Sequence, residues 1–161
     1  LDFLRSDPTD EWPPTKTFDL SLDLRNNTMN AIAIGDKVAV LERFGRPTNR
    51  LPSREGFFNY EFSGAEFGAT DGLIDYFAMA IIDDPTVPLR AASAKMTGRD
   101  GRVLKLSSRT TIADVKSLIG VEPFSDVDEE EIVETYDLGD YTLEVEATPA
   151  GHLKRVNYFL D

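Results

Sequence analysis

The sequence predicts an α+β fold, in which one or two antiparallel sheets are built from two repeated helix-plus-three-strand units with short helices on one face. Three observations support this prediction. Segments that alternate apolar and polar residues recur along the chain, tight turns join most of them, and two short helical stripes each end in a glycine. Because parallel strands require long crossovers, the tight turns exclude an all-parallel sheet.

An internal correspondence between the two halves of the chain underlies the repeat. Pro47 and Pro123 lie 76 positions apart, and so do Tyr60 and Tyr136. The correspondence thus keeps its register across a helical stretch and the strand that follows it, as expected for a duplicated unit. We expect three segments that pack as one globular domain: an extended N-terminal arm over 1–16, a first repeat unit over 17–90 and a second over 91–161.

The N-terminal arm is predicted from its prolines. Pro8, Pro13 and Pro14 lie among acidic and small polar residues, a composition that favours extended chain over helix. We expect Trp12 to pack this arm against the rest of the protein.

The first unit contains a strand, a short helix and a three-stranded meander. Residues 18–24 alternate apolar and polar without a fault, which is typical of a strand with one buried face. Val38, Leu41 and Phe44 form one stripe of a predicted helix over 36–44, which a following glycine ends. The strands expected in the meander are 57–62, 65–69 and 73–82.

The second unit has the same order of elements. A hairpin is predicted first, and its strands are 92–96 and 102–106. Thr111 and Asp114 form a predicted capping box at the start of a helix that Gly120 ends. The strands expected after this helix are 132–138, 141–148 and 152–160.

This order, with a glycine-ended helix followed by a tyrosine-led strand and two more strands, occurs twice and resembles the tandem repeats of the β-lactamase inhibitor protein family. It is similar also to the single repeat of the small outer-membrane assembly lipoproteins. The resemblance implies the shape of the repeat and a role in protein binding, but no particular binding residue. The chain departs from both families by having no cysteine. The residues that carry the resemblance are Gly35, Val38, Leu41, Phe44, Gly45, Pro47, Tyr60, Gly72, Ile74, Val115, Leu118, Gly120, Tyr136, Gly151 and Leu153.

Composition excludes several classes of function. Without cysteine there is no disulfide, thiol catalysis or cysteine-ligated metal site. The net charge of −12 disfavours nucleic acids and anionic lipid surfaces and favours a basic protein partner. The longest apolar stretch, 76–82, is far shorter than a bilayer span of about 20 residues. Since residues 1–8 also lack the pattern of a secretion signal, we expect a soluble protein and favour the cytoplasm over the periplasm.

The densest aromatic stretch, 57–62, supplies the candidate binding surface. Alternation from Phe58 sends every second side chain to the core, including Phe62, and leaves Phe57 on the opposite face. Aromatic side chains on an open sheet face favour protein docking. The candidate partner-binding residues are Trp12, Phe57, Asn59, Glu61, Tyr141 and Tyr158.

Other chemical signals have simpler structural interpretations. His152, the only histidine, follows a turn glycine, and no sequence pattern gives it the partners of a general base. The acidic run 126–131 lacks the ligand spacing of a calcium loop and is interpreted as a solvated connection. Turn and strand-end positions account for the acids that could form a hydrolytic carboxylate pair, which are Asp71, Asp75, Asp83 and Asp84.

We therefore expect a non-enzymatic protein-binding module of inhibitor, immunity or assembly type, with no catalytic residue, cofactor or metal. The first alternative is a carboxylate-based hydrolase or small-ligand-binding protein with a cleft between the two units. A deep pocket with two or more acids would favour that alternative. A second alternative is a homodimer that pairs open sheet edges.

Overall fold

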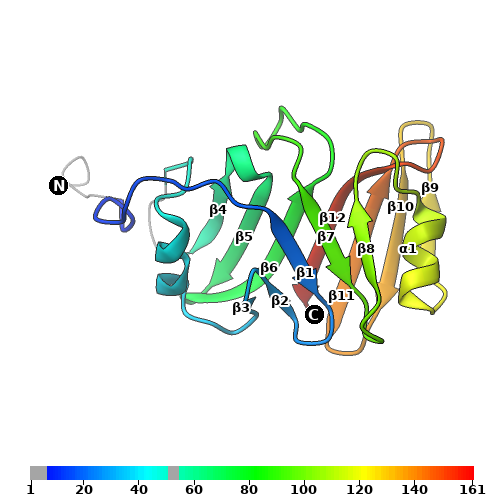
Figure 1. Ribbon diagram of the computed structural model, residues 1–161, viewed down its shortest axis with the longest axis horizontal. Coiled ribbons are helices and arrows are strands. Elements are labelled where there is room, and N and C mark those ends of the chain that lie inside the picture. The colour runs from blue at the N-terminus through cyan, green and yellow to red at the C-terminus, as the bar shows by residue number, and fades with distance from the viewer. Residues whose placement is uncertain (1–6, 51–54) are drawn as a thin grey trace.

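The protein is built mostly from β-strands, as the computed structural model shows for residues 7–50 and 55–161 (Figure 1). Strands make up 43% of the described residues and helices 12%. The predicted α+β class is therefore wrong, and two large sheets form the architecture. The helical segments are too short to make a layer of their own, so most apolar burial comes from one sheet packing on the other.

The larger sheet has seven strands in the order β4-β5-β6-β12-β11-β10-β9, all paired antiparallel. The central pair is β6 and β12, which come from different halves of the chain. The strands are β4 (Gly56–Tyr60), β5 (Ala65–Thr70), β6 (Leu73–Ala80), β9 (Phe124–Val127), β10 (Ile132–Asp137), β11 (Tyr141–Ala147) and β12 (Leu153–Leu160).

The smaller sheet has five strands in the order β3-β2-β1-β7-β8. Its central strands, β1 and β7, are parallel, with Leu22 opposite Met96. Parallel pairing was not expected, but the long chain between these strands supplies the crossover that it requires. Both sheets thus take strands from both halves of the chain, so neither is the product of a single helix-plus-strand unit. The strands are β1 (Leu20–Asp23), β2 (Thr28–Met29), β3 (Ile32–Ala33), β7 (Ala94–Thr97) and β8 (Val103–Leu106).

The first predicted helix is shorter than expected and is a 3₁₀-helix, η2 (Val38–Phe44). Val38, Leu41 and Phe44 are buried, and their spacing of three suits the three residues per turn of a 3₁₀-helix. Lys37 at the N-cap makes no side-chain capping bond, and β-branched Val38 and Val40 weaken α-helix propensity.

The second predicted helix is an α-helix, α1 (Ile112–Ile119), and its capping box is confirmed. Thr111 accepts a hydrogen bond from the backbone N–H of Asp114, whose carboxylate accepts one in return from the backbone N–H of Thr111. Gly120 ends the helix in the left-handed conformation at φ 77°. Capping explains why this stripe forms a regular helix and the first does not.

The hydrophobic core lies between the two sheets. One face of the seven-stranded sheet contributes buried rings such as Phe58, Phe67 and Phe77, and the small sheet contributes Leu20 and Leu22. The ring centroids of Phe67 and Phe77 are 5.7 Å apart at a near-perpendicular angle. In Figure 1, η2 and α1 flank the small sheet on either side.

Most predicted strands are confirmed within a few residues of their expected ends, and two segments differ from expectation. The strand expected over 57–62 ends at Tyr60, because a 3₁₀ turn, η3 (Glu61–Ser63), bends the chain. Phe62 is consequently 59% exposed and does not enter the core. The acidic connection expected over 126–131 instead begins within β9, which pairs with β10 at the sheet edge.

The N-terminal arm is described from Asp7 onward, and its first six residues lie outside the described part of the chain. Backbone hydrogen bonds close turns over 7–12, and Trp12 packs against the core. The chain then runs beside the end of η2, where a Cβ on Gly45 would lie 2.1 Å from the carbonyl oxygen of Pro14. Only glycine permits this close approach.

Among the described helices, none combines the length and the apolar character needed to span a bilayer.

Candidate functional site

The candidate site is the outer face of the seven-stranded sheet, meaning the face turned away from the five-stranded sheet. Its side chains follow from strand register. One row runs across four strands through Phe57, Gly68, Tyr76 and Phe159. The next rows carry the polar side chains of Asn59, Glu66, Asn157, Glu144, Arg155 and Glu146.

Two β-bulges add charged side chains to this face. Gly68 pairs with Tyr76 and Ala69 with Ile74, so Asp75 is an extra residue in β6. The second bulge leaves Lys154 as an extra residue in β12. Because a bulge interrupts alternation, Asp75 and Tyr76 line the same groove, although they are consecutive.

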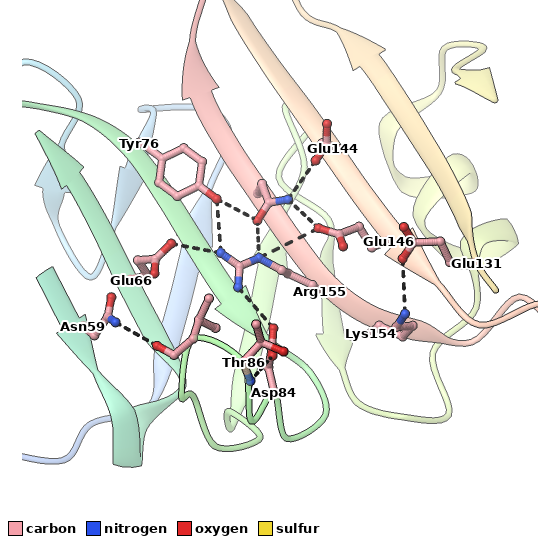
Figure 2. Close-up of polar contacts among 12 residues, drawn as sticks. Asn59, Glu66, Tyr76, Asp84, Thr86, Glu131, Glu144, Glu146, Lys154 and Arg155 are labelled. Atoms are coloured by element: carbon pink, nitrogen blue, oxygen red, sulfur yellow. Dashed lines mark hydrogen bonds and ion pairs between the residues drawn. The ribbon is translucent and has the colours of Figure 1, made fainter. Parts of the chain in front are cut away.

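Arg155 is the centre of a polar network on the outer face (Figure 2). Its Nη2 donates to Glu66 Oε1 at 3.0 Å and to the Tyr76 hydroxyl at 3.2 Å. Two further carboxylates lie near the guanidinium, with Asp84 Oδ2 3.7 Å from Nη1 and Glu146 Oε2 3.8 Å from Nε. The side chain of Arg155 is only 14% exposed, so these contacts compensate a largely buried charge.

Asn157 links the guanidinium to the acids of the neighbouring strand. Its Oδ1 accepts from Arg155 Nε at 2.7 Å and from the Tyr76 hydroxyl at 3.1 Å. Its Nδ2 donates to Glu144 Oε1 at 3.0 Å and to Glu146 Oε2 at 2.9 Å. This buried amide, with all its partners in place, holds side chains of three strands, β6, β11 and β12, in one arrangement.

Burial sets the titration behaviour of this network. It raises the pKa of the Glu66 carboxyl above its ordinary value, and the adjacent Arg155 acts in the opposite direction. Burial likewise raises the pKa of the Tyr76 hydroxyl. The carboxylates of Glu66, Asp84 and Glu146 lie within 4 Å of the Arg155 guanidinium, and Glu144 contacts Asn157, so the network carries more acids than bases.

A groove of about 520 Å³ lies beside the network. The ring of Tyr76 meets that of Phe57 edge to face at 5.5 Å and stacks with that of Phe159 at 6.0 Å. Gly68 lies below, since a Cβ there would be 2.8 Å from the Cβ of Tyr76 and 3.3 Å from Phe57 Cε1. Acids also line the groove, namely Glu55 and Asp75.

The structure brings some of the predicted binding residues together on this face. Phe57 is 53% exposed in the groove, and Asn59 lies one row away, where its Nδ2 donates to the carbonyl oxygen of Val87. Glu61 lies in η3 beyond the end of β4, 4.0 Å from Arg90.

The other predicted binding residues lie elsewhere. Tyr158 is fully buried on the inner face of the sheet, and Tyr141 stacks on it at 5.5 Å. The hydroxyl of Tyr158 donates to Asn27 Oδ1 at 2.5 Å. Trp12 packs near Val38 and Phe58 at the end of the core. The hypothesis that these three side chains join the outer aromatic set therefore does not match their positions.

The remaining candidates are placed in turns and edges. His152 forms an isolated bridge with Thr111, next to α1. Asp128 accepts hydrogen bonds from the backbone N–H groups of Glu130 and Glu131, which lower the pKa of its carboxyl and close the turn after β9. No group of three or more potential ligand residues able to hold a metal occurs among residues 7–50 and 55–161.

Sequence reasoning missed the centre of the site. Arg155 lies inside β12, between apolar residues such as Leu153 and Val156, and Glu66 lies in a short strand of mostly small and apolar residues. A charged residue in the middle of a central strand was the available signal, because such a residue is retained only when it has partners.

No protein-family model matches this chain, and no curated protein matches it either. Among solved structures, a DUF4309 family protein (YjgB) from Bacillus subtilis subsp. subtilis str. 168 is similar, with a TM-score of 0.51. The two sequences are 18% identical, and the match covers 81% of this chain and 83% of that chain. At this identity the likeness shows a shared fold alone. The resemblance to the β-lactamase inhibitor protein family stays a prediction.

Proposed function

We propose that the protein is a non-enzymatic binding module whose outer face docks a protein partner with a basic surface. One observation carries the proposal: a row of three aromatic side chains, Phe57, Tyr76 and Phe159, lies beside a network with an excess of acids on an open sheet face. Rings with large apolar area and few rotatable bonds are the residues on which protein interfaces most depend.

The charge of the chain supports a basic partner. A net charge of −12 produces a field that speeds association with a positively charged surface and repels acidic ones. The resemblance to inhibitor repeats implies protein binding as well.

The state of the carboxylates favours docking over hydrolysis. Glu66, Glu144 and Glu146 each contact Arg155 or Asn157, and these contacts hold them in place. A hydrolytic pair would need one carboxyl placed to donate a proton and another placed to act on the opposite side of a substrate. Within this network, the hydrolase alternative therefore has no specific contact in its support.

The test is capture of a partner by wild-type protein and by a Phe57→Ser, Phe159→Ser double variant, using an extract of the source cells. We expect wild type to retain a stoichiometric partner and the double variant to bind it at least about tenfold more weakly, as calorimetry with the purified pair would measure.

The matched control is Phe124→Ser, which removes a more exposed ring at the far end of the same sheet. It should leave the affinity unchanged. Equal retention by all three proteins, or no stoichiometric partner at all, would overturn the docking proposal.

A further inference from the structure

The geometry points to the groove beside Phe57, Tyr76 and Phe159 as a binding site for an arginine side chain. The inference rests on the proposed docking function, because it names the group by which a basic partner would be held. It goes further by assigning a chemical class of ligand to a defined site.

The aromatic walls favour a planar cation. Phe57 and Tyr76 meet edge to face while Tyr76 and Phe159 are stacked, so ring faces and edges of three side chains border one groove. A cation above an aromatic face is attracted by the ring quadrupole, and the guanidinium group also stacks on such faces. The protein already contains a contact of this kind, with the guanidinium carbon of Arg90 5.7 Å from the ring centroid of Phe62.

The carboxylates supply the charge. The bulge in β6 places Asp75 at the groove, and its carboxylate has no hydrogen-bond or ion-pair partner among the described residues. Glu55 also lines the groove and accepts a hydrogen bond from the backbone N–H of Asp71 at 2.7 Å. A guanidinium has five donors in a fixed fork and can contact a carboxylate while its plane rests on a ring.

The resident arginine does not cancel this charge. Arg155 donates to the hydroxyl of Tyr76, but Glu66, Asp84 and Glu146 lie within 4 Å of its guanidinium. The groove therefore borders a network that is itself acidic. A cation bound in the groove can pair with the Asp75 carboxylate, which no described cation neutralises.

The groove also has the size for one side chain. Its volume of about 520 Å³ lies within the usual range for small-ligand sites of about 300–1,000 Å³. Gly68 forms the floor between these rings, where a Cβ would lie 2.8 Å from the Cβ of Tyr76, so the missing side chain lets Phe57 and Tyr76 pack directly on the backbone of β5.

The experiment is an NMR titration of the full chain with the peptide acetyl-Gly-Arg-Gly-amide. The control peptide replaces arginine by citrulline, which keeps the planar shape and loses the charge. We expect saturable shifts in the amide signals of Phe57, Gly68, Asp75 and Phe159 with the arginine peptide, and at least about fivefold weaker binding of the citrulline peptide.

Two variants test the site itself. Asp75→Asn should weaken arginine-peptide binding about fivefold, and Phe57→Leu, which keeps the apolar bulk, about threefold. Asp126→Asn on β9 removes the same charge from an exposed position far along the sheet and should change nothing. Circular dichroism would check that each variant is folded.

Equal binding of the two peptides would overturn the inference, as would equal weakening by Asp75→Asn and Asp126→Asn, because the net charge alone would then account for binding. No saturable shift up to about 20 mM peptide would overturn it too. Another outcome is that the peptide fails to bind while the Phe57→Ser, Phe159→Ser variant still captures less partner than wild type. That result would overturn the arginine site and leave the docking proposal supported. Arginine-specific binding without any partner keeps the site and removes the docking proposal.

Discussion

Different interactions stabilise the two faces of the seven-stranded sheet. On the inner face, Phe58, Tyr60 and Phe67 pack with the smaller sheet in a fully buried apolar core. On the outer face, Arg155 and Asn157 are almost as well covered, but charge and hydrogen bonds hold them. Strand alternation assigns consecutive residues to opposite faces, so one sheet provides both environments.

This contrast indicates which face of the sheet can carry function. In an apolar core, each buried atom that a substitution removes lowers the free energy of unfolding, so core positions tolerate few substitutions. A polar network on an open face specifies geometry, and its members stay near solvent where a partner can reach the adjoining groove. Stability should therefore depend most on the inner face, and binding on the outer face.

The largest expected effect on stability is on the inner face. Phe67→Ala removes a fully buried ring that contacts Phe44, Tyr60 and Phe77, and should lower the free energy of unfolding by about 3–5 kcal/mol in urea titrations. The control is Phe57→Ala on the adjacent strand, where the ring is half exposed and the loss should stay below about 1 kcal/mol. Similar losses from both variants would contradict the distinction between the faces.

A somewhat smaller effect is expected at the centre of the outer network. Arg155→Met keeps much of the side-chain volume but leaves the buried Glu66 carboxylate without its cation, which should cost about 3 kcal/mol near neutral pH. The Arg155→Met, Glu66→Gln double variant should recover part of the lost free energy of unfolding, because it no longer buries an unpaired carboxylate. A double variant that is less stable than Arg155→Met alone would show that the cost has another origin.

The smallest effect is the pH dependence that Glu66 contributes. Burial raises the pKa of this carboxyl above 4.5, so the folded protein holds the proton more tightly than the unfolded chain. The contribution to stability is complete below pH 4.5 and is lost as pH rises through the raised pKa. Unfolding in urea between about pH 4 and pH 7 should therefore show the stability of wild type, relative to Glu66→Gln, falling with pH. A difference that rises with pH would mean that the attraction of Arg155 outweighs burial.

Much of the strand layout could be predicted, for reasons that particular residues show. The alternation of 18–24 and the turn residues at Gly72 and Gly151 are local signals, and strands form where they indicate. The capping box of α1 is local as well. The α+β class was wrong because two glycine-ended stripes were given more weight than the strands around them.

The candidate site was predicted only in part. Phe57 and Asn59 were assigned to the outer face because alternation within a single strand is enough to place them. Tyr141 and Tyr158 were misplaced, since their face depends on how β11 and β12 pair within the sheet. Asp75 lines the groove only because a β-bulge interrupts β6, and the regular alternation of side chains along a strand does not predict such a bulge.

Local sequence is enough to place most strands, the two ends of α1 and the net negative charge, because propensity and capping depend on neighbouring residues and net charge on composition. The parallel pairing of β1 with β7 and the pairing of β6 with β12, by contrast, are set by tertiary packing. That second pairing brings Glu66 and Tyr76 to Arg155, 79 or more positions away along the chain. Contacts at this separation arise from the free energy of packing two sheets, which no local pattern encodes.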